Sequence, residues 1–370
     1  MSARGRMSGD VPRVLALAAI VAVFAALSPD FLGARNLYML AIELSITAIL
    51  ALGMFLVILP GHIDLSAGSG VGLIGGVAAV LITRAGWPAP AAMAAAAVLA
   101  VLLWRAMGRM IVSQRMPSFI ITLGGLLAFK GLFWMVIRNS TVPVSPAGAL
   151  NIYARLTTTY VPPAWGWAGV AVLAAVLFGR WARRNARDAR GGGEEDFLRA
   201  LIGVQLAALF VAVVNGFRGV PLPALLLALS YAVTVLLTEH APFGRRLYAI
   251  GGNEEAAHLA GIDVDGTVVA AFALMGAAVA VTGFLQTAYA GASTTTVGDL
   301  MELDAIAACV IGGTSLKGGR GSARGVIFGA LIMATLLNGM TLLAVPPEIK
   351  YVTRGVVLAL AVWLDTRLAG

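Results

Sequence analysis

Long apolar runs separated by short polar segments dominate this chain of 370 residues. Many of the runs approach or exceed the roughly 20 residues that a helix needs to cross the hydrocarbon core of a bilayer. The pattern therefore predicts an all-α integral membrane protein with about 10–12 transmembrane or re-entrant helices. The predicted spans cover residues 14–29, 37–60, 63–83, 89–108, 117–137, 165–179, 197–215, 222–239, 267–290, 323–344 and 350–365.

A shorter apolar segment covers residues 302–313 and is too short to cross a bilayer fully. This length predicts a broken or re-entrant helix, which is tolerated only where protein or an aqueous path surrounds the irregular backbone. Glu302 and Asp304 stand at its start, where the positive end of a helix dipole stabilises carboxylates.

Composition excludes a soluble protein, because 59% of the residues are hydrophobic and 12% are charged, whereas soluble domains carry roughly 25% charged residues. The formal net charge of +8 comes from Lys and Arg scattered over short loops, which argues against a nucleic-acid surface. With residues 1–13 in the cytoplasm, most of these cations fall on the cytoplasmic side, as the positive-inside rule requires.

One transmembrane domain is expected over residues 1–370. The charged, glycine-containing segment 180–199 is typical of a solvated cytoplasmic loop. The lone cysteine, Cys309, excludes an internal disulfide.

The most conspicuous polar island lies at residues 244–262, on the cytoplasmic side. Within it, Gly251 and Gly252 predict a turn. Asn253 is placed to cap a following short helix by accepting from its first free amide groups. A short helix outside the membrane, capped in this way, is suited to contact with another protein.

The rest of this predicted helix supports the same interpretation. Glu254 and Glu255 fall in its first turn, at the positive end of the dipole, and Gly261 is placed to end it. Small or apolar side chains form its predicted surface: Ala256, Ala257, Leu259 and Ala260.

Ionisable residues at membrane depth are costly and mark candidate functional sites. Asp64 and Ser66 follow a predicted helix break at Pro60-Gly61, where they either cap the next helix or face a polar cavity. Asn338 either joins helices or contacts a substrate hydroxyl. The ionisable candidates are Glu43, Asp64, Lys130, Glu302, Asp304 and Arg354.

No enzyme, nucleotide or metal site is predicted within the chain. Gly70-x-Gly72-x-x-Gly75 matches a dinucleotide-binding pattern but lies inside an apolar span, so close helix packing through Gly68, Gly72 and Gly76 is favoured. Lys317 lacks the Gly-Lys-Ser/Thr ending of a phosphate loop. The histidines are scattered, without metal-ligand spacing.

A weak internal similarity links residues 61–76 with residues 312–330. Tandem related halves are common in transporters, but chance similarity among glycine-rich membrane segments is an equal alternative.

Four stretches together resemble the permease subunits of bacterial ATP-binding-cassette (ABC) importers for monosaccharides, in the ribose/xylose/galactose branch. The resemblance covers roughly residues 35–365 and is strongest toward the xylose permeases. The stretches are Gly61–Ser69, Pro117–Gly124, Phe243–Ile262 and Glu302–Leu316.

This resemblance implies a type II-like permease of the bacterial cytoplasmic (inner) membrane that moves D-xylose or a related pentose by alternating access, with ribose, galactose or another small polar solute left open. It implies membrane lipid, cytoplasmic ATP-binding subunits that bind ATP and Mg²⁺, an external sugar-binding protein, and a second permease chain, expected to be identical. This chain itself is expected to bind no cofactor, metal or nucleic acid.

The resemblance also implies residue roles. The expected contact region for the ATPase comprises Gly244, Arg245, Gly251, Gly252, Asn253, Glu254, Glu255, Ala256, Ala257 and Gly261. The expected translocation path comprises Asp64, Ser66, Phe119, Thr122, Glu302 and Asn338. The alternatives are an ion-coupled secondary transporter, against which the sparse acidic residues argue, and a membrane scaffold without transport.

Overall fold

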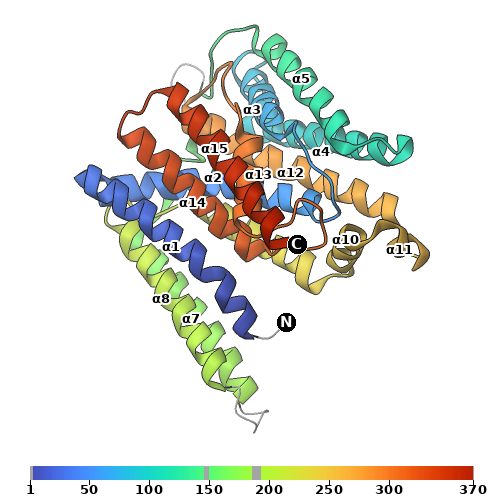
Figure 1. Ribbon diagram of the computed structural model, residues 1–370. Helices are drawn as coiled ribbons and strands as arrows, with labels where there is room; N and C mark the ends of the chain where they lie inside the picture. Colours follow the sequence, from blue (N-terminus) through green and yellow to red (C-terminus); the bar gives the residue numbers. More distant parts are fainter. Residues whose placement is uncertain (1–2, 146–149, 186–192, 370) are drawn as a thin grey trace.

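Helices dominate the computed structural model, which describes residues 3–145, 150–185 and 193–369 (Figure 1). The helices are α1 (Ala3–Leu27), η1 (Pro29–Leu32), α2 (Ala34–Ile58), α3 (Ala67–Thr83), α4 (Ala89–Gln114), α5 (Ser118–Ile137), α6 (Ile152–Arg155), α7 (Pro163–Asn185), α8 (Gly193–Asn215), α9 (Leu222–Val235), η3 (Leu236–His240), α10 (Pro242–Gly252), α11 (Glu254–Leu259), α12 (Val264–Ala290), α13 (Met301–Ile311), α14 (Ala323–Leu342) and α15 (Pro347–Ala369). The strands are β1 (Val142–Pro143), β2 (Tyr160–Val161), β3 (Val220–Pro221) and β4 (Ala292–Ser293).

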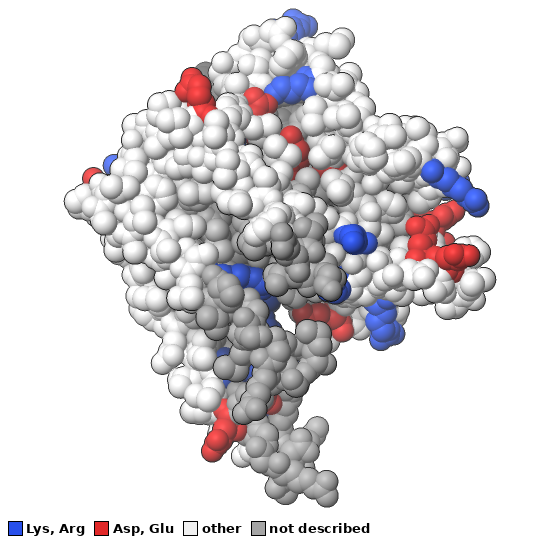
Figure 2. Space-filling model, viewed as in Figure 1, with Lys and Arg blue, Asp and Glu red and all other residues white. Residues whose placement is uncertain are grey.

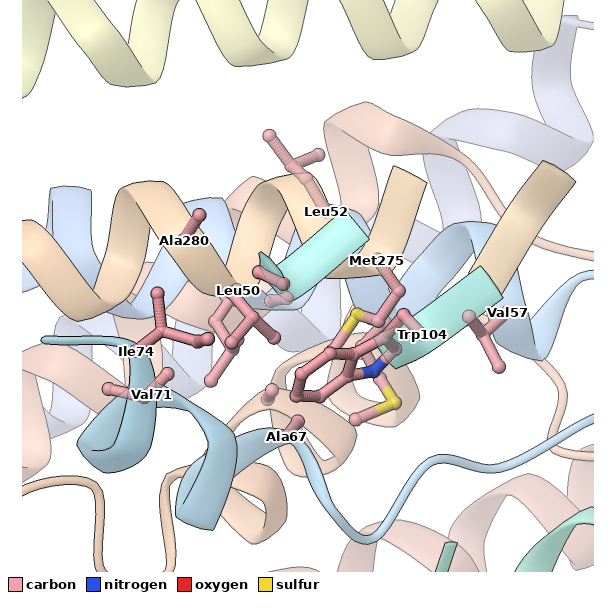
Figure 3. Packing of buried hydrophobic residues seen from close by; sticks show 14 of the residues in the cluster. Leu50, Leu52, Val57, Ala67, Val71, Ile74, Trp104, Met275 and Ala280 are labelled. Atoms are coloured by element: carbon pink, nitrogen blue, oxygen red, sulfur yellow. The ribbon is translucent and has the colours of Figure 1, made fainter. Parts of the chain in front are cut away.

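The buried core lies around α2 and α12, which pack on each other and on α3, α4, α13 and α14 (Figure 1). Both helices are apolar around most of their circumference, which is typical of helices surrounded by protein. Figure 3 shows Trp104 of α4 lying between Met275 of α12 and Ala67 of α3. The core therefore fixes the start of α3 relative to two long helices.

Eight helices in the described part of the chain are long and apolar enough to cross a membrane, with shorter apolar helices at Arg13–Leu27 and Ala67–Thr83. The predicted segment 302–313 coincides with the short helix α13. Several of the long helices, α5 and α7–α9 among them, leave most of their apolar surface exposed. The prediction of an all-α membrane protein is confirmed.

Two predicted loops are partly helical. Within the predicted loop 180–199, α7 continues to Asn185 and α8 begins at Gly193, while residues 186–192 lie outside the described residues. Likewise α1 extends back to Ala3 through the predicted cytoplasmic segment 1–13. These ends were missed because hydropathy marks where a helix leaves the bilayer and not where the helix ends. Around the loop, Arg and Ala at the end of α7 and Glu at the start of α8 are residues that favour a helix in water.

Short strand pairs tie two loops to distant helices. Val142 pairs with Ser293 and Tyr160 with Pro221, both in antiparallel register. The loop after α5 is thereby joined to the end of α12, and the segment before α7 to the start of α9.

The predicted packing role of the regularly spaced glycines is confirmed. A Cβ on Gly72 would lie 2.5 Å from the Val297 carbonyl oxygen and 2.8 Å from the Phe133 ring. A Cβ on Gly329 would lie 2.0 Å from the Ala308 carbonyl oxygen. Close backbone contact, rather than a cofactor, accounts for these glycines.

Candidate functional site

The polar island folds as two short helices that meet at Asn253. Its backbone is extended, with φ −164°, and its side chain accepts a hydrogen bond of 2.9 Å from the Ala256 amide. Gly261 has φ +80° just after α11, a conformation that glycine adopts at little cost. The predicted cap and stop of this helix are confirmed.

Gly251 and Gly252 do not form the predicted turn. They are the last residues of α10, and the chain changes direction at Asn253 instead. The Asn253 amide still donates to the Ala249 carbonyl over 3.1 Å, so α10 keeps its hydrogen bonding up to the break.

The residues expected to contact an ATPase divide into two sets. Gly244, Gly251 and Ala257 pack against the chain itself, which corrects the expectation that Ala257 belongs to the outer surface of α11. The second, exposed set comprises Arg245, Gly252, Asn253, Glu254, Glu255, Ala256 and Gly261. Leu259, on the same short helix, is 81% exposed, an unusual position for a large apolar side chain in water.

Charged side chains gather at this end of the molecule. Figure 2 shows blue and red side chains where α10 and α11 lie, whereas most of the visible face is uncharged. This distribution fits a surface in water beside a body in a membrane.

Gly251 stands at a junction of three backbone segments. A Cβ there would lie 1.9 Å from the Leu59 carbonyl oxygen and 2.3 Å from the Gly319 nitrogen. The Gly319 amide donates to the Leu59 carbonyl over 2.9 Å, and the Tyr248 hydroxyl donates to the Gly321 carbonyl over 3.0 Å. Displacement of α10 therefore acts directly on the end of α2 and on the loop between α13 and α14.

His62 lies in the same junction, just after α2. Burial lowers the pKa of His62, and the nearby Glu254 carboxylate opposes that change. The charge of Glu254 on α11 thus affects the pKa of His62, which belongs to the segment that leads into α3.

Between α2 and α3 the backbone leaves helical geometry, as predicted at Pro60-Gly61. Side chains of α5 form the hydrogen bonds with the Ile63 backbone that a continuous helix would otherwise supply. The Ile63 amide donates to Ser118 Oγ over 3.1 Å, and Thr122 Oγ1 donates to the Ile63 carbonyl over 3.1 Å. The start of α5 is therefore bound to the break.

Asp64 is fully buried and accepts three hydrogen bonds. Its Oδ1 accepts from the Ser66 amide at 2.8 Å and from Ser66 Oγ at 2.6 Å, while Oδ2 accepts from Trp104 Nε1 at 2.6 Å. The buried carboxylate thus stabilises the break, and its bond from the Ser66 amide, just before α3, favours the predicted cap over a polar cavity. The Ser66 hydroxyl donates to Asp64 and does not cap α3.

Glu302 and Phe119 lie beside this cluster. Glu302 is in the first turn of α13, as predicted, and its carboxylate lies against Gly68, where a Cβ would be only 1.9 Å from Oε2. Phe119 on α5 is 51% exposed. Among the expected path residues, Asp64, Ser66 and Thr122 lie together, with Glu302 and Phe119 on the adjoining helices.

Asn338 lies apart, in a polar cluster between α2, α12 and α14. Its Nδ2 donates to Glu43 Oε2 over 3.0 Å, and its Oδ1 accepts from Asn36 over 2.9 Å. Glu43 also accepts from the Tyr289 hydroxyl over 2.9 Å. The helix-joining alternative for Asn338 is thus supported by its contacts.

Two ion pairs involve ionisable residues that the sequence singles out, Arg354, Asp304 and Lys130. Arg354 Nε on α15 lies 3.1 Å from Asp304 Oδ1 on α13. Lys130 on α5 pairs with Asp299 and donates to the Thr295 carbonyl over 3.0 Å. Lys130 retains 22% exposure and Asp299 32%, so this pair borders the surface. Charges so placed require water or protein around them.

Sequence reasoning missed Trp104, Asp299 and Tyr289. Each joins an ionisable candidate only through tertiary packing, across more than 150 residues for Asp299 and Tyr289. The ionisable Lys130 inside an apolar run was the available signal for a partner such as Asp299. Among the described residues, no group of His, Cys, Asp or Glu is arranged to hold a metal ion.

Comparison with known proteins decides the family. A family model described as "Branched-chain amino acid transport system / permease component" matches residues 36–362. This chain belongs to that permease family. Its members are components of ABC importers, so the family implies ATPase and substrate-binding partners.

Several curated permeases are similar over nearly the whole chain. The xylose transport system permease protein XylH of Escherichia coli (strain K12) is 42% identical, covering 95% of this chain and 90% of that protein. Its counterpart from Haemophilus influenzae is 39% identical, covering 95% of each. The ribose import permease protein RbsC of Bacillus subtilis (strain 168) is 32% identical, covering 95% and 91%. No solved structure matches the chain.

The permease family confirms that the chain is a transport subunit and not an enzyme. It also confirms a multi-pass protein of the bacterial inner membrane.

Proposed function

We propose that this chain is the permease subunit of an ABC importer for D-xylose. The observation that carries the sugar assignment is the 42% identity to a xylose permease over 95% of the chain, compared with 32% to ribose permeases. Ribose or a related pentose is the second candidate, because these relatives align over similar lengths.

Energy enters through α10 and α11. Partner subunits bind ATP and Mg²⁺, and one of them holds the exposed set around Asn253 together with Leu259. Support comes from the exposure of this set and from the junction at Gly251, through which α10 contacts the end of α2 and the loop after α13. A push on α10 is thereby delivered to the backbone around the break at residues 59–66.

The sugar passes along the side of the chain formed by α5, α13 and α15. Phe119 is exposed there on α5, while Asp64, Ser66, Thr122 and Glu302 are buried inside the chain. Asn338 is not proposed to contact the sugar, because its amide is engaged by Glu43 and Asn36. Its proposed role is to join α14 to α2.

A second, identical permease chain covers this side. The pair Lys130–Asp299 joins α5 to the segment before α13 and is partly exposed. The remaining outward surface of α5 is apolar, and contact of the pair with lipid would be costly. Gly124 and Gly131 of α5 have open space where a Cβ would be, so a neighbouring backbone can approach them closely.

Sugar-stimulated ATP hydrolysis tests the assignment. The chain is reconstituted in proteoliposomes with its ATPase and binding protein, and hydrolysis is measured with xylose, ribose, arabinose, galactose and glucose. The proposal predicts the largest stimulation with xylose. Greater stimulation with ribose selects the second candidate, and no stimulation by any pentose refutes the pentose assignment.

A further inference from the structure

A groove of about 400 Å³ lies between α2, α8, α9 and α14, away from the residues proposed to handle sugar. Its walls are almost wholly apolar, with Leu44, Phe210, Leu227 and Phe328 among the lining side chains. The hydroxyl of Ser45 also lines it but already donates to the Ala41 carbonyl over 2.6 Å. A sugar would find too few partners for its hydroxyl groups here, because unpaired polar groups are costly to bury.

One end of the groove carries a positive charge. Arg324, which is in the first turn of α14, lines the groove. Tyr231 of α9 also lines it. Within the described ranges, no carboxylate forms an ion pair with Arg324. This end faces the cytoplasm if α10 does, as the proposed function requires, because the loop that leads into α14 contacts α10 at Gly251.

The flank beside the groove is suited to hydrocarbon. Leu206 and Leu209 of α8 and Leu229 of α9 are each 62% exposed. The ion pairs Lys130–Asp299 and Arg354–Asp304 involve other elements, namely α5, α13, the segment before α13, and α15. The groove is therefore an apolar channel beside an exposed apolar surface, and Arg324 is among the residues that line it.

We propose that this groove binds an anionic phospholipid of the cytoplasmic leaflet. One acyl chain occupies the apolar channel, and the phosphate binds Arg324, whose planar guanidinium can donate two hydrogen bonds to phosphate oxygens. The positive end of the α14 dipole adds to the attraction. Basic pockets between transmembrane helices on the cytoplasmic side are suited to such headgroups.

Native mass spectrometry of the delipidated full-length chain tests this site. The chain is titrated with phosphatidylglycerol and with phosphatidylcholine that carry the same acyl chains, and the first bound lipid is quantified. Wild type should prefer phosphatidylglycerol. Arg324→Gln should reduce that preference about fivefold, the effect of roughly 1 kcal/mol per basic residue at a membrane surface.

Two further variants separate charge from shape. Arg320→Gln removes a cation from the same cytoplasmic loop without touching the groove and should keep the preference. Ala228→Trp fills the channel from an exposed position on α9 while retaining Arg324, and should weaken binding of both lipids. Melting temperatures of all variants confirm that they are folded.

Four outcomes would overturn the site. Equal binding of the two lipids by wild type would show that charge has no role. Equal losses of the phosphatidylglycerol preference in Arg324→Gln and Arg320→Gln would show that the basic residues attract the lipid without a specific site. Unchanged lipid binding by Ala228→Trp places the lipid elsewhere. If Ala228→Trp instead changes the oligomeric state, a protein and not a lipid covers the groove.

Discussion

The indole nitrogen of Trp104 donates a hydrogen bond of 2.6 Å to Oδ2 of Asp64, and both side chains are fully buried. The two residues lie on different elements, α4 and the break before α3. Their contact holds the broken segment against the core and gives Asp64 a partner that water cannot replace.

Trp104→Phe should lower the free energy of unfolding by about 2 kcal/mol, because a hydrogen bond to a carboxylate is lost while the ring is largely retained. Denaturant unfolding in detergent measures the change. Trp165→Phe, at a position 71% exposed, is the matched control and should have little effect. Equal stability of both variants would show that Asp64 does not depend on Trp104.

Gly251→Ala should destabilise the junction by about 2 kcal/mol, a typical cost of overpacking. The added methyl would lie 1.9 Å from the Leu59 carbonyl oxygen. Gly252→Ala is the control in the next position, since its Cβ would have nothing within 4 Å. Thermal melts compare the two, and a Gly251→Ala protein as stable as Gly252→Ala would contradict the three-segment contact.

Part of this site was predictable from sequence because its signals are local. Asn253 followed by two glutamates predicts a capped helix, and Gly261 predicts its end, since capping depends on neighbours in the chain. Long apolar runs likewise predicted the membrane helices. Ala256 and Ala257 show the limit: they are adjacent and identical, yet the first is exposed and the second buried.

The missing information was tertiary. The pairing of Lys130 with Asp299 depends on how α5 packs beside the segment before α13, and no local pattern encodes that contact. The helical ends at Asn185 and Ala3 were missed for another reason, because hydropathy reports the membrane boundary rather than the end of a helix.

Stability should fall as pH decreases below about 6.5, the ordinary pKa of histidine. Burial lowers the pKa of His62, so the unfolded chain takes up a proton that the folded chain resists, and stability is lost as pH falls. His62→Gln should flatten this part of the profile in melting experiments from pH 7.5 to 5.5. His258→Gln, on the exposed surface of α11, controls for loss of an imidazole; equal profiles for wild type and His62→Gln would exclude His62 as the source.

A cysteine at position 131 should link two copies of the chain. Cys309 is buried, and Cys309→Ser provides a background without a free thiol. In that background, Gly131→Cys on α5 should form a disulfide-linked dimer upon mild oxidation in membranes. Gly169→Cys on α7 is equally exposed and has equal open space, so it is the control; linkage at position 169 without linkage at 131 would place the second chain elsewhere.

ATP-driven xylose uptake by proteoliposomes tests most directly whether a partner drives this chain through α11. Wild type, Glu254→Lys and Leu259→Ser are each reconstituted with the ATPase and binding protein. Both substituted side chains are exposed, so Leu259→Ser should keep the wild-type melting temperature. Glu254→Lys, which places a cation at the positive end of the α11 dipole, should lower it only slightly. The account predicts at least tenfold slower uptake by both, the effect of losing about 1.4 kcal/mol of contact energy, and no uptake without the ATPase. Wild-type uptake by both variants, or xylose transport by the chain alone, would contradict it.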